Sequence, residues 1–525
     1  MARVEALVIG GGATGAGIAR DLALRGTEVL LLERGDFCNG ASGGNHGVLH
    51  SGARYAVKDP ASAADCASES RVLRRIAPYC IDDCGGIFVS LPGDDPSYVE
   101  RFQGACKSTG VVFSPLTIQE ARGIEPELSP EVLSAFQVND GSLDPFALVL
   151  GNIESAREAG ATVLNYRAVH SFKVGRGSID EVVYRDSMSG EAEKVKPEVV
   201  INAAGAWAGE IASMAKARLE VQLDKGSMVV LDGRCSRGLV NRLRPPANGD
   251  IIVPNHSATI IGTTSVALGK AVPTQVTREE VRELSMQGAL MCPSLAKARA
   301  VRAYSGIRAL SPSAAGRDAS RGFQVVEHSR QGPDNLVSVL GGKLTTYRLM
   351  AEKAADVACH ILGSKRSGRT AQTPICEEGA EPWLEGVLQT YSRRIWRKYG
   401  PGREKVLAAC SQRSRGTEIA CSCEQVLLGE LEHFAAHPDV RTLSDLTRRT
   451  RAGMGYCQSG MCALQALSTL ASRTEQDPKR MLEDFLSERW KGLCPVLEGV
   501  QLRQEVLKRY LLTGTYQLSI SEVRR

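Results

Sequence analysis

Four cysteines near the C-terminus have the spacing of ligands for a redox metal centre. Cys421 and Cys423 form a C-x-C pair, and Cys457 and Cys462 form a C-x4-C pair. Four thiolates on two loops suit a 2Fe–2S cluster, which passes electrons singly. Structural zinc is the alternative, although its cysteine pairs are usually spaced C-x2-C to C-x4-C, and C-x-C is tighter. The spacing favours an iron–sulfur cluster and leaves zinc open.

A glycine-rich loop at the other end of the chain predicts a second redox group. Gly10, Gly12 and Gly15 follow an apolar run of strand length at 4–9 and precede a helical pattern. Such glycines allow the tight turn, the approach of backbone N–H groups to a pyrophosphate and close helix–strand packing. Glu33, at the end of the next predicted strand, can accept from ribose hydroxyls and would repel a 2′-phosphate. The loop predicts a dinucleotide, NAD or FAD, which takes electrons in pairs.

The remaining pattern predicts the elements that hold these groups. Alternating and buried apolar runs indicate further strands, a helix follows the G-G-K segment, and the polar stretch 363–382 has the composition of a linker. In the tail, Leu502, Val506, Leu507, Tyr510 and Leu511 recur at helical spacing and predict a packing face. The predicted elements are helix 16–25, strands 28–32, 195–202, 226–231, 258–262 and 336–340, and helix 345–362.

Composition limits the class of protein. The chain has 525 residues, enough for about two to four domains, and 43% hydrophobic with 23% charged residues is a globular profile. The net charge of +5 comes without a block of Lys or Arg, so nucleic-acid binding is not expected. There is no signal-peptide pattern and no run of about 18 apolar residues. With 15 cysteines, these features predict a cytoplasmic protein with reduced thiols.

Six segments together resemble a known enzyme family along nearly the whole chain. They are IGGGATGAGIARD (9–21), NHGVLHSGARYA (45–56), VINAAG (200–205), IGTTS (261–265), RAYSGIRAL (302–310) and GGKLTTYRLMAE (341–352). The chain resembles the catalytic A subunits of anaerobic, FAD-dependent glycerol-3-phosphate dehydrogenases. The GGKLTTYR segment is the most specific part and favours FAD over NAD.

The resemblance implies a mixed α/β fold of the glutathione-reductase FAD-binding type with an inserted β-rich substrate domain and a small helical C-terminal cysteine domain. The implied divisions are 1–80, 150–215 and 318–362 for a discontinuous FAD domain, 81–149 and 216–317 for the substrate domain, 363–417 for a linker with helix, 418–475 for the 2Fe–2S domain, and 476–525 for a helical tail.

The resemblance also implies which residues meet the cofactor. Small or backbone-donating residues suit close approach to a flat ring and a pyrophosphate. The implied FAD contacts are Gly10, Gly12, Ala13, Thr14, Gly15, Glu33, Arg34, Ser42, Gly43, Asn45, Ala204, Gly205, Gly341, Gly342, Lys343, Leu344 and Thr345.

Basic residues on the matched segments imply a site for the phosphate of glycerol 3-phosphate. A phosphate dianion suits guanidinium forks and point charges, and converging cations without an anion are costly. The implied substrate contacts are Arg54, Tyr55, Arg308, Arg321, Lys343 and Thr346. The base that removes the hydroxyl proton remains open: His50 is the best histidine, with a core role as its rival, and an arginine or lysine such as Arg308 or Lys343 is the alternative.

The cysteine segment is similar to the ferredoxin-like domain known from bacterioferritin-associated ferredoxin, although the second pair there is often C-x-x-C. Three arginines, Arg448, Arg449 and Arg451, precede Cys457 and are expected to balance the negative charge of an iron–thiolate cluster. Cys410 and Cys494 lie near the four cysteines but outside the pattern.

These implications define the expected function and its rivals. The expectation is oxidation of glycerol 3-phosphate to dihydroxyacetone phosphate, with electrons passing through the cluster to partner subunits and quinone. Having no membrane span of its own, the chain would lie on the inner face of the membrane through those partners. The alternatives are an FAD-dependent dehydrogenase of a 2-hydroxy acid or an amine, and an electron-transfer subunit without substrate chemistry.

Overall fold

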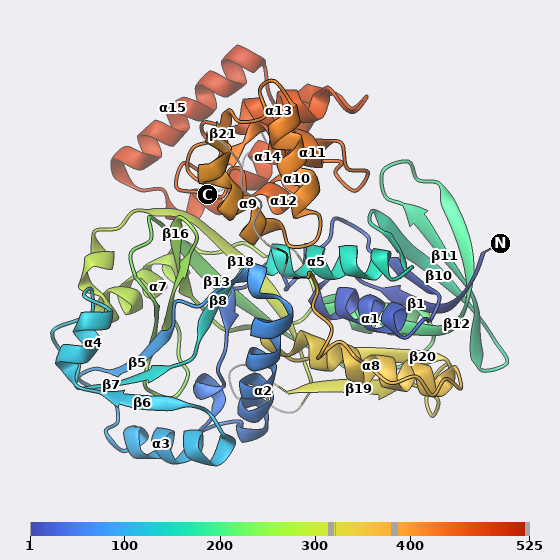
Figure 1. The fold of residues 1–525 in the computed structure, drawn as a ribbon, viewed down its shortest axis with the longest axis horizontal. Helices are drawn as coiled ribbons and strands as arrows, with labels where there is room; N and C mark the ends of the chain where they lie inside the picture. The colour runs from blue at the N-terminus through green and yellow to red at the C-terminus, as the bar shows by residue number, and fades with distance from the viewer. Residues whose placement is uncertain are drawn as a thin grey trace.

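The computed structural model describes residues 2–272, 274–312, 320, 322–377, 379 and 387–519. Two large sheets lie side by side, and the C-terminal helices cover the region where they meet (Figure 1). Among the described residues, no helix combines the length and the apolar character that crossing a bilayer requires.

The first sheet is built on parallel strands that the apolar runs of the sequence predict. Its order is β10-β11-β12-β1-β2-β9, and β20 joins it by pairing with β12 and β19. Every residue of β2 is buried, as a strand covered on both faces requires. The strands are β1 Ala2–Ile9, β2 Val29–Leu32, β9 Thr162–Leu164, β10 Arg167–Gly175, β11 Ser178–Asp186, β12 Ala192–Asn202, β19 Phe323–Glu327 and β20 Leu336–Gly341.

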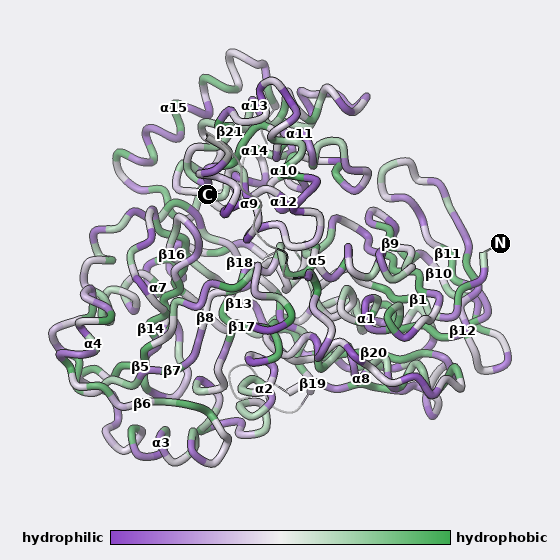
Figure 2. The backbone as a smooth tube through the Cα atoms, in the orientation of Figure 1, coloured by the Kyte–Doolittle hydropathy of each residue, from purple (hydrophilic) through white to green (hydrophobic). Residues whose placement is uncertain are grey.

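Helices cover both faces of this sheet. On one face α1 (Ala13–Leu24), α5 (Pro145–Glu158) and α8 (Tyr347–Ile361) share one hydrophobic core with β1, β2 and β20. On the other face α6 (Ala208–Met214) and the β10–β11 hairpin close a second core. Figure 2 shows hydrophobic colour along strands of this sheet and also in the part of the chain that carries the second sheet.

The second sheet has nine strands, with β18 pairing β13 beside the path β17-β13-β16-β15-β14-β5-β7-β6. Its strands are β5 Gly86–Ser90, β6 Phe113–Leu116, β7 Ser134–Val138, β13 Gln222–Asp232, β14 Leu239–Arg242, β15 Ile251–Asn255, β16 Ala258–Gly262, β17 Val266–Leu268 and β18 Ala300–Leu310. A small third sheet is formed where the chain passes between the two large sheets. Its strands, in spatial order, are β3 (Val48–Leu49), β8 (Gly141–Leu143) and β4 (Ile81–Asp82). The helices of this part are α2 Pro60–Ile76, α3 Ser97–Thr109, α4 Ile118–Ile124 and α7 Arg278–Met291.

The C-terminal part is mostly helical and has its own hydrophobic core around Leu431, Leu446 and Phe485. Its elements are α9 Val387–Tyr399, α10 Arg403–Gln412, β21 Ile419–Cys421, β22 Val426–Leu427, α11 Leu428–Ala435, α12 Leu443–Thr450, α13 Ala463–Ala471, α14 Pro478–Leu493 and α15 Gly499–Tyr516. We call residues 418–519 the cysteine module.

The structure confirms the mixed α/β fold class and corrects two expectations. The predicted strands exist, while α1 begins three residues earlier than the apolar pattern suggests, because Gly12 rather than an apolar residue forms its N-cap. The tail helix α15 exists, but none of its residues is buried, so its apolar residues do not form the predicted packing face.

Candidate active site

A cavity of about 990 Å³ opens between the first and second sheets, and residues of both line it. Eighteen of the residues that the sequence singled out are among its walls, brought there from the ends of β1, β2, β12 and β20, from β18 and from the segment between β2 and α2. They are Gly10, Gly12, Ala13, Thr14, Glu33, Arg34, Ser42, Asn45, His50, Arg54, Tyr55, Ala204, Gly205, Arg308, Gly341, Gly342, Lys343 and Leu344.

Other expected contacts lie behind the wall. A Cβ on Gly15 would lie 1.9 Å from the Gly10 carbonyl oxygen, so Gly15 serves packing of the loop. The buried Thr345 hydroxyl accepts from the His50 amide at 3.1 Å. Thr346 bonds through its hydroxyl to the backbone of Lys343 and lies outside the cavity lining, so its expected contact with substrate stays a prediction. Gly43 also lies outside the cavity lining, and Arg321 lies outside the described residues.

The first half of the cavity fits a dinucleotide. Helix α1 points its N-terminus at the cavity, and its N-cap Gly12 makes no side-chain cap. The Ala13 amide donates to the Ser42 hydroxyl at 2.9 Å, and the other amides of the first turn are the backbone donors that such a helix terminus offers to phosphate oxygens. The Glu33 carboxylate accepts from the amides of Gly11 at 2.7 Å and Gly35 at 2.8 Å, which sets the loop around it. Burial raises the pKa of Glu33, and these two bonds oppose the rise.

A flat aromatic surface in this half was missed from the sequence. The Arg34 guanidinium lies 3.8 Å from the centroid of the Trp207 ring, and both residues line the cavity. Stacked planes of this kind offer a face to a purine. The signal is the tryptophan two residues after the VINAAG segment, in the short 3-10 helix Gly205–Trp207 that follows β12.

The other half of the cavity is basic, but its arginines already have carboxylate partners. Arg54 donates to Asp250 at 2.8 Å, and Arg308 is paired with Asp224. This corrects the expectation of cations left without anions. Arg308 also donates to the Thr263 hydroxyl at 2.6 Å and to the Thr264 carbonyl at 3.3 and 3.4 Å. A guanidinium has five N–H donors, so Arg54 keeps several for a ligand in the cavity and Arg308 keeps its Nε–H. The Lys343 amine lies 4.7 Å from the centroid of the Tyr55 ring.

Two histidines stand beside these cations. His50 packs edge-on against Tyr55 with ring centroids 5.1 Å apart, and His46 lies 5.8 Å from His50. Burial, with the charges of Arg308 and Arg54, lowers the pKa of His46 to about 3, and burial also lowers the pKa of His50. Both imidazoles are therefore neutral near pH 7, and the Nδ1 atom of each is buried without a hydrogen-bond partner among the described residues. Sequence reasoning weighed His50 and overlooked His46 in the same segment.

The four cysteines meet as two pairs, each joining one C-x-C thiol to one C-x4-C thiol. Cys462, at the N-cap of α13, donates to the Cys421 sulfur and lowers the pKa of Cys421 to about 6. Cys423 donates in the same way to Cys457. Two pairs of soft ligands on two loops fit an iron–sulfur cluster, which takes thiolates on each iron.

The three arginines expected to face the cluster fasten the cysteine module to the rest of the chain instead. Arg448 and Arg449 both bind Asp36 at 3.0 Å, on the loop after β2. Arg451 binds Asp144 at 3.1 Å, at the N-cap of α5. Buried arginines need carboxylates. Asp36 and Asp144 lie in the part of the chain that carries the first sheet, whereas the second partner of Arg451, Glu424 at 2.9 Å, directly follows Cys423.

A different arginine approaches the cysteines. Arg489 of α14 is buried and donates to Gln458 at 3.2 Å, within the loop that carries Cys457 and Cys462. Burial and Arg302 lower the pKa of Arg489 to about 9, whereas the two thiols raise it. Its sequence position, outside every motif, offered no signal.

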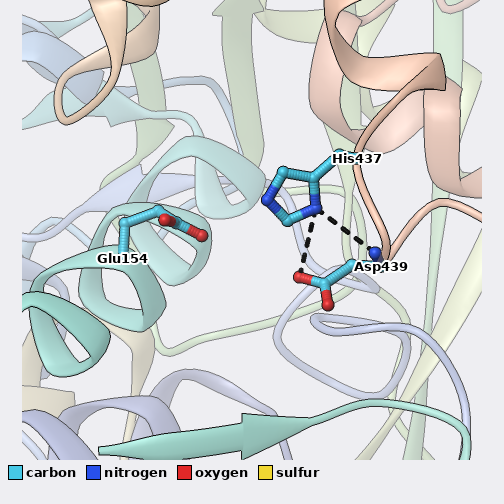
Figure 3. A group of neighbouring side chains, drawn as sticks. All are labelled: Glu154, His437 and Asp439. Atoms are coloured by element: carbon cyan, nitrogen blue, oxygen red, sulfur yellow. Dashed lines mark hydrogen bonds and ion pairs between the residues drawn. The ribbon is translucent and has the colours of Figure 1, made fainter. Parts of the chain in front are cut away.

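A further group of metal-ligating side chains, Glu154, His437 and Asp439, lies at the edge of this contact (Figure 3). In the figure His437 and Asp439 come from one loop of the module and Glu154 from α5. The Arg157 guanidinium supplies the positive charge that these carboxylates need, because it donates to Glu154 at 2.8 Å and to Asp439 at 2.8 and 3.0 Å. The group is an ion-pair contact between the cysteine module and α5.

Comparisons with known proteins agree with this geometry. Residues 5–356 match the model of the FAD dependent oxidoreductase family, DAO. In Escherichia coli K12, the A component of the anaerobic glycerol-3-phosphate dehydrogenase is 40% identical over 97% of this chain and 96% of its own. The A1 component of the corresponding Haloferax volcanii enzyme is 37% identical over 97% of this chain and 90% of its own.

Among solved structures, a glycerol-3-phosphate dehydrogenase from Bacillus halodurans complexed with FAD superposes with a TM-score of 0.71. The two chains are 23% identical, and the match covers 95% of this chain and 96% of the other. At this identity the likeness concerns the fold.

Proposed function

The chain belongs to the FAD-dependent oxidoreductase family, within which it groups with the A subunits of anaerobic glycerol-3-phosphate dehydrogenase, and from this premise we propose that it oxidises glycerol 3-phosphate at C2 to dihydroxyacetone phosphate. The observation that carries the proposal is the two-part cavity. One part has the backbone donors and the flat Arg34–Trp207 surface that a dinucleotide requires, and the other is lined by Arg54, Arg308 and Lys343.

FAD fits the first part, where the α1 N-terminus would hold the pyrophosphate and Glu33 would accept from the ribose hydroxyls. When bound there, its isoalloxazine supplies the hydride acceptor for the C2–H bond. Gly341, Gly342 and Leu344 form the wall that continues from the nucleotide half into the basic half.

The basic half binds and orients the substrate. Arg54 and Arg308 donate to the phosphate from opposite domains, and the fixed carboxylates Asp250 and Asp224 hold each guanidinium in place. Such anchoring limits the conformational entropy lost when the phosphate binds.

His50 accepts the proton of the C2 hydroxyl as hydride leaves. Its neutral form and unpartnered Nδ1 suit a base, and its amide bond to Thr345 ties its segment to the loop after β20. His46, neutral for the same reason, is the adjacent group that can relay the proton.

Cys421, Cys423, Cys457 and Cys462 are proposed to hold a 2Fe–2S cluster, which would supply single-electron transfer to companion subunits and, through them, to quinone. The paired thiols support this assignment, and the names of the relatives, which are components of larger enzymes, support the existence of companions. A place on the inner face of the membrane, held by those companions, belongs to the same proposal.

An anaerobic reduction assay tests the proposed activity. Purified protein with bound FAD, mixed with glycerol 3-phosphate under nitrogen, should lose its flavin absorbance. Glycerol, which lacks the phosphate, should bleach the flavin far more slowly at equal concentration. Bleaching by a 2-hydroxy acid or an amine but not by glycerol 3-phosphate would overturn the proposal.

A further inference from the structure

Helix α15 exposes an apolar face that nothing in the described chain covers. Tyr510 is 74% exposed, Leu507 59% and Leu511 55%, and Val500 also faces solvent. In Figure 2 the tube of α15 alternates between hydrophobic and hydrophilic colour along its length. Large apolar residues gathered on one side of a helix mark an interaction surface more often than chance.

The face has the geometry of a helix-packing stripe. Val500, Leu507 and Gly514 are spaced by seven residues, and Tyr510 and Leu511 flank them, so they share one side of the helix. The opposite side rests on the protein: Leu512 packs on the core of the module, and the Arg509 guanidinium lies 4.9 Å from the Trp490 ring centroid. The stripe is thus held in a fixed orientation, facing outward.

The stripe lies beside the cysteines. A Cβ on Gly460, between Cys457 and Cys462, would lie 3.2 Å from the Lys508 amine of α15. Two further apolar side chains emerge here: Met461, 80% exposed, and Tyr456, whose hydroxyl bonds to Cys423. We call Val500, Leu507, Tyr510, Leu511, Tyr456 and Met461 the outlet face.

We infer that the outlet face docks the companion protein that receives the electrons, through an apolar helix of that protein bearing a carboxylate opposite Arg503. This deepens the proposed function and rests on it for the direction of electron flow. A protein seated on α15 covers the loop that carries Cys457 and Cys462, which brings its own redox group to the thiols without any movement of the module.

Charge favours a companion protein over the two other occupants that an apolar helix face suggests, a second copy of this chain and a membrane surface. Arg503 is exposed in the middle of the stripe, and the exposed side of α15 bears no carboxylate. A second copy docking through the same face would bury Arg503 without a carboxylate, because a two-fold contact presents the same patch twice. A membrane-lying helix carries its cations on the polar side, opposite the apolar one.

Binding of the full-length holoprotein to purified companion subunits from the same organism tests the inference. Leu507→Glu and Arg503→Glu should each raise the dissociation constant about tenfold or more, since both residues lie at the centre of the face. Leu133→Glu is the matched control: Leu133 is 62% exposed, lies in the second sheet's domain, and should leave affinity within about twofold. Unchanged melting temperatures and visible spectra show that the variants are folded and loaded.

Three results would overturn the inference. The first is companion binding that both α15 variants leave unchanged. The second is a concentration-dependent dimer in sedimentation that Leu507→Glu abolishes. The third is binding to phosphatidylcholine–phosphatidylglycerol vesicles that Leu507→Glu abolishes while companion binding persists. Failure of the proposed activity is separate, because it appears as absent flavin bleaching with normal companion binding.

Discussion

The Arg449 guanidinium donates to both carboxylate oxygens of Asp36 at 3.0 Å, across 413 residues of sequence. Asp36 lies on the loop after β2, and Arg448, which shares this carboxylate, also donates to Asn39 in the cavity wall at 2.9 Å. The loop that shapes the dinucleotide site is therefore also the seat of the cysteine module. A bound dinucleotide that orders this loop is therefore expected to favour packing of the cysteine module against it. By the same coupling, packing of the module is expected to increase the affinity for the dinucleotide.

Replacing Asp36 by Asn should destabilise the chain by about 3–5 kcal/mol, because the buried Arg449 and the partly buried Arg448 lose the carboxylate that they share. Burial would raise the pKa of Asp36, but Arg449 and Arg448 hold it below its usual value, so the carboxylate is charged at neutral pH. Urea denaturation followed by fluorescence measures the loss. Glu220→Gln, at the exposed Arg218 pair, is the control and should stay within about 0.5 kcal/mol. Equal stability of D36N and wild type would contradict the seating role.

The sequence could predict what depends on neighbours in the chain. Strands β1, β2 and β20 and the loop of Gly10 to Gly15 follow from local apolar runs and glycines, and these segments do line one cavity. The carboxylate partners of Arg448, Arg449 and Arg451 could not be predicted, because Asp36 and Asp144 are distant in sequence. The roles of cavity residues in substrate binding remain predictions.

The same reasoning explains the misjudged tail. Periodicity predicts that Leu507 and Tyr510 share one side of a helix, and they do. It does not state what lies against that side, which depends on how α15 meets α14 and the module core. Charge balance likewise suggested a cation near the thiols, and Arg489 supplies one from an element without any motif.

Gly12→Ala should fold and lose FAD. Its backbone has φ −80°, which alanine adopts, and the new Cβ would meet only Ser42 Oγ at 3.0 Å on the protein side. The methyl group then occupies the place where phosphate oxygens approach the backbone. The FAD content of purified protein, read from the ratio of visible to ultraviolet absorbance, should fall at least tenfold.

Two other glycines calibrate this result. Gly10→Ala should prevent folding, because at φ +112° its Cβ would lie 2.5 Å from the Ala203 carbonyl oxygen. Gly104 lies on α3 with open space around it. Gly104→Ala should therefore keep FAD and raise the free energy of unfolding by about 0.5–1 kcal/mol. Full FAD occupancy in G12A would remove this glycine from the phosphate site.

Arg54→Ala should raise KM for glycerol 3-phosphate by about tenfold to a hundredfold, the value of one or two charge-assisted hydrogen bonds of about 1.5–3 kcal/mol. The fold should survive, because Asp250 keeps Arg244 at 2.8 Å as a partner. Anaerobic dye reduction over a range of substrate concentrations gives KM and kcat. Arg101→Ala, an exposed arginine on α3, should leave both constants unchanged. An unaltered KM in R54A would exclude Arg54 from phosphate binding.

His46 should make the chain sensitive to acid. Its pKa is 6.5 in the unfolded chain and about 3 in the folded one. Between these two pH values the unfolded state binds a proton that the folded state does not bind. Stability is therefore lost as the pH falls from 6.5 towards 3, at about 1.4 kcal/mol per pH unit for one such group. His46→Gln should lower the slope of unfolding free energy against pH by that amount between about pH 6 and 5. His170 is exposed on β10, so His170→Gln should show the same slope of unfolding free energy against pH as wild type. If His46→Gln also showed the wild-type slope, burial of a neutral His46 imidazole would be contradicted.

Cys421→Ser should remove the iron–sulfur centre and leave the flavin site intact. Cys421 receives the hydrogen bond of Cys462 within one thiol pair, so its loss breaks a ligand set that no neighbouring side chain completes among the described residues. Anaerobically purified wild type should contain about two irons per chain and show the EPR signal of a reduced cluster, and C421S should show neither while keeping its FAD. Cys410→Ser is the matched control, since Cys410 is buried against Gly429 outside the thiol pairs and should retain both irons. About one zinc per chain in place of iron would overturn the cluster and, with it, the single-electron route from the flavin to the outlet face.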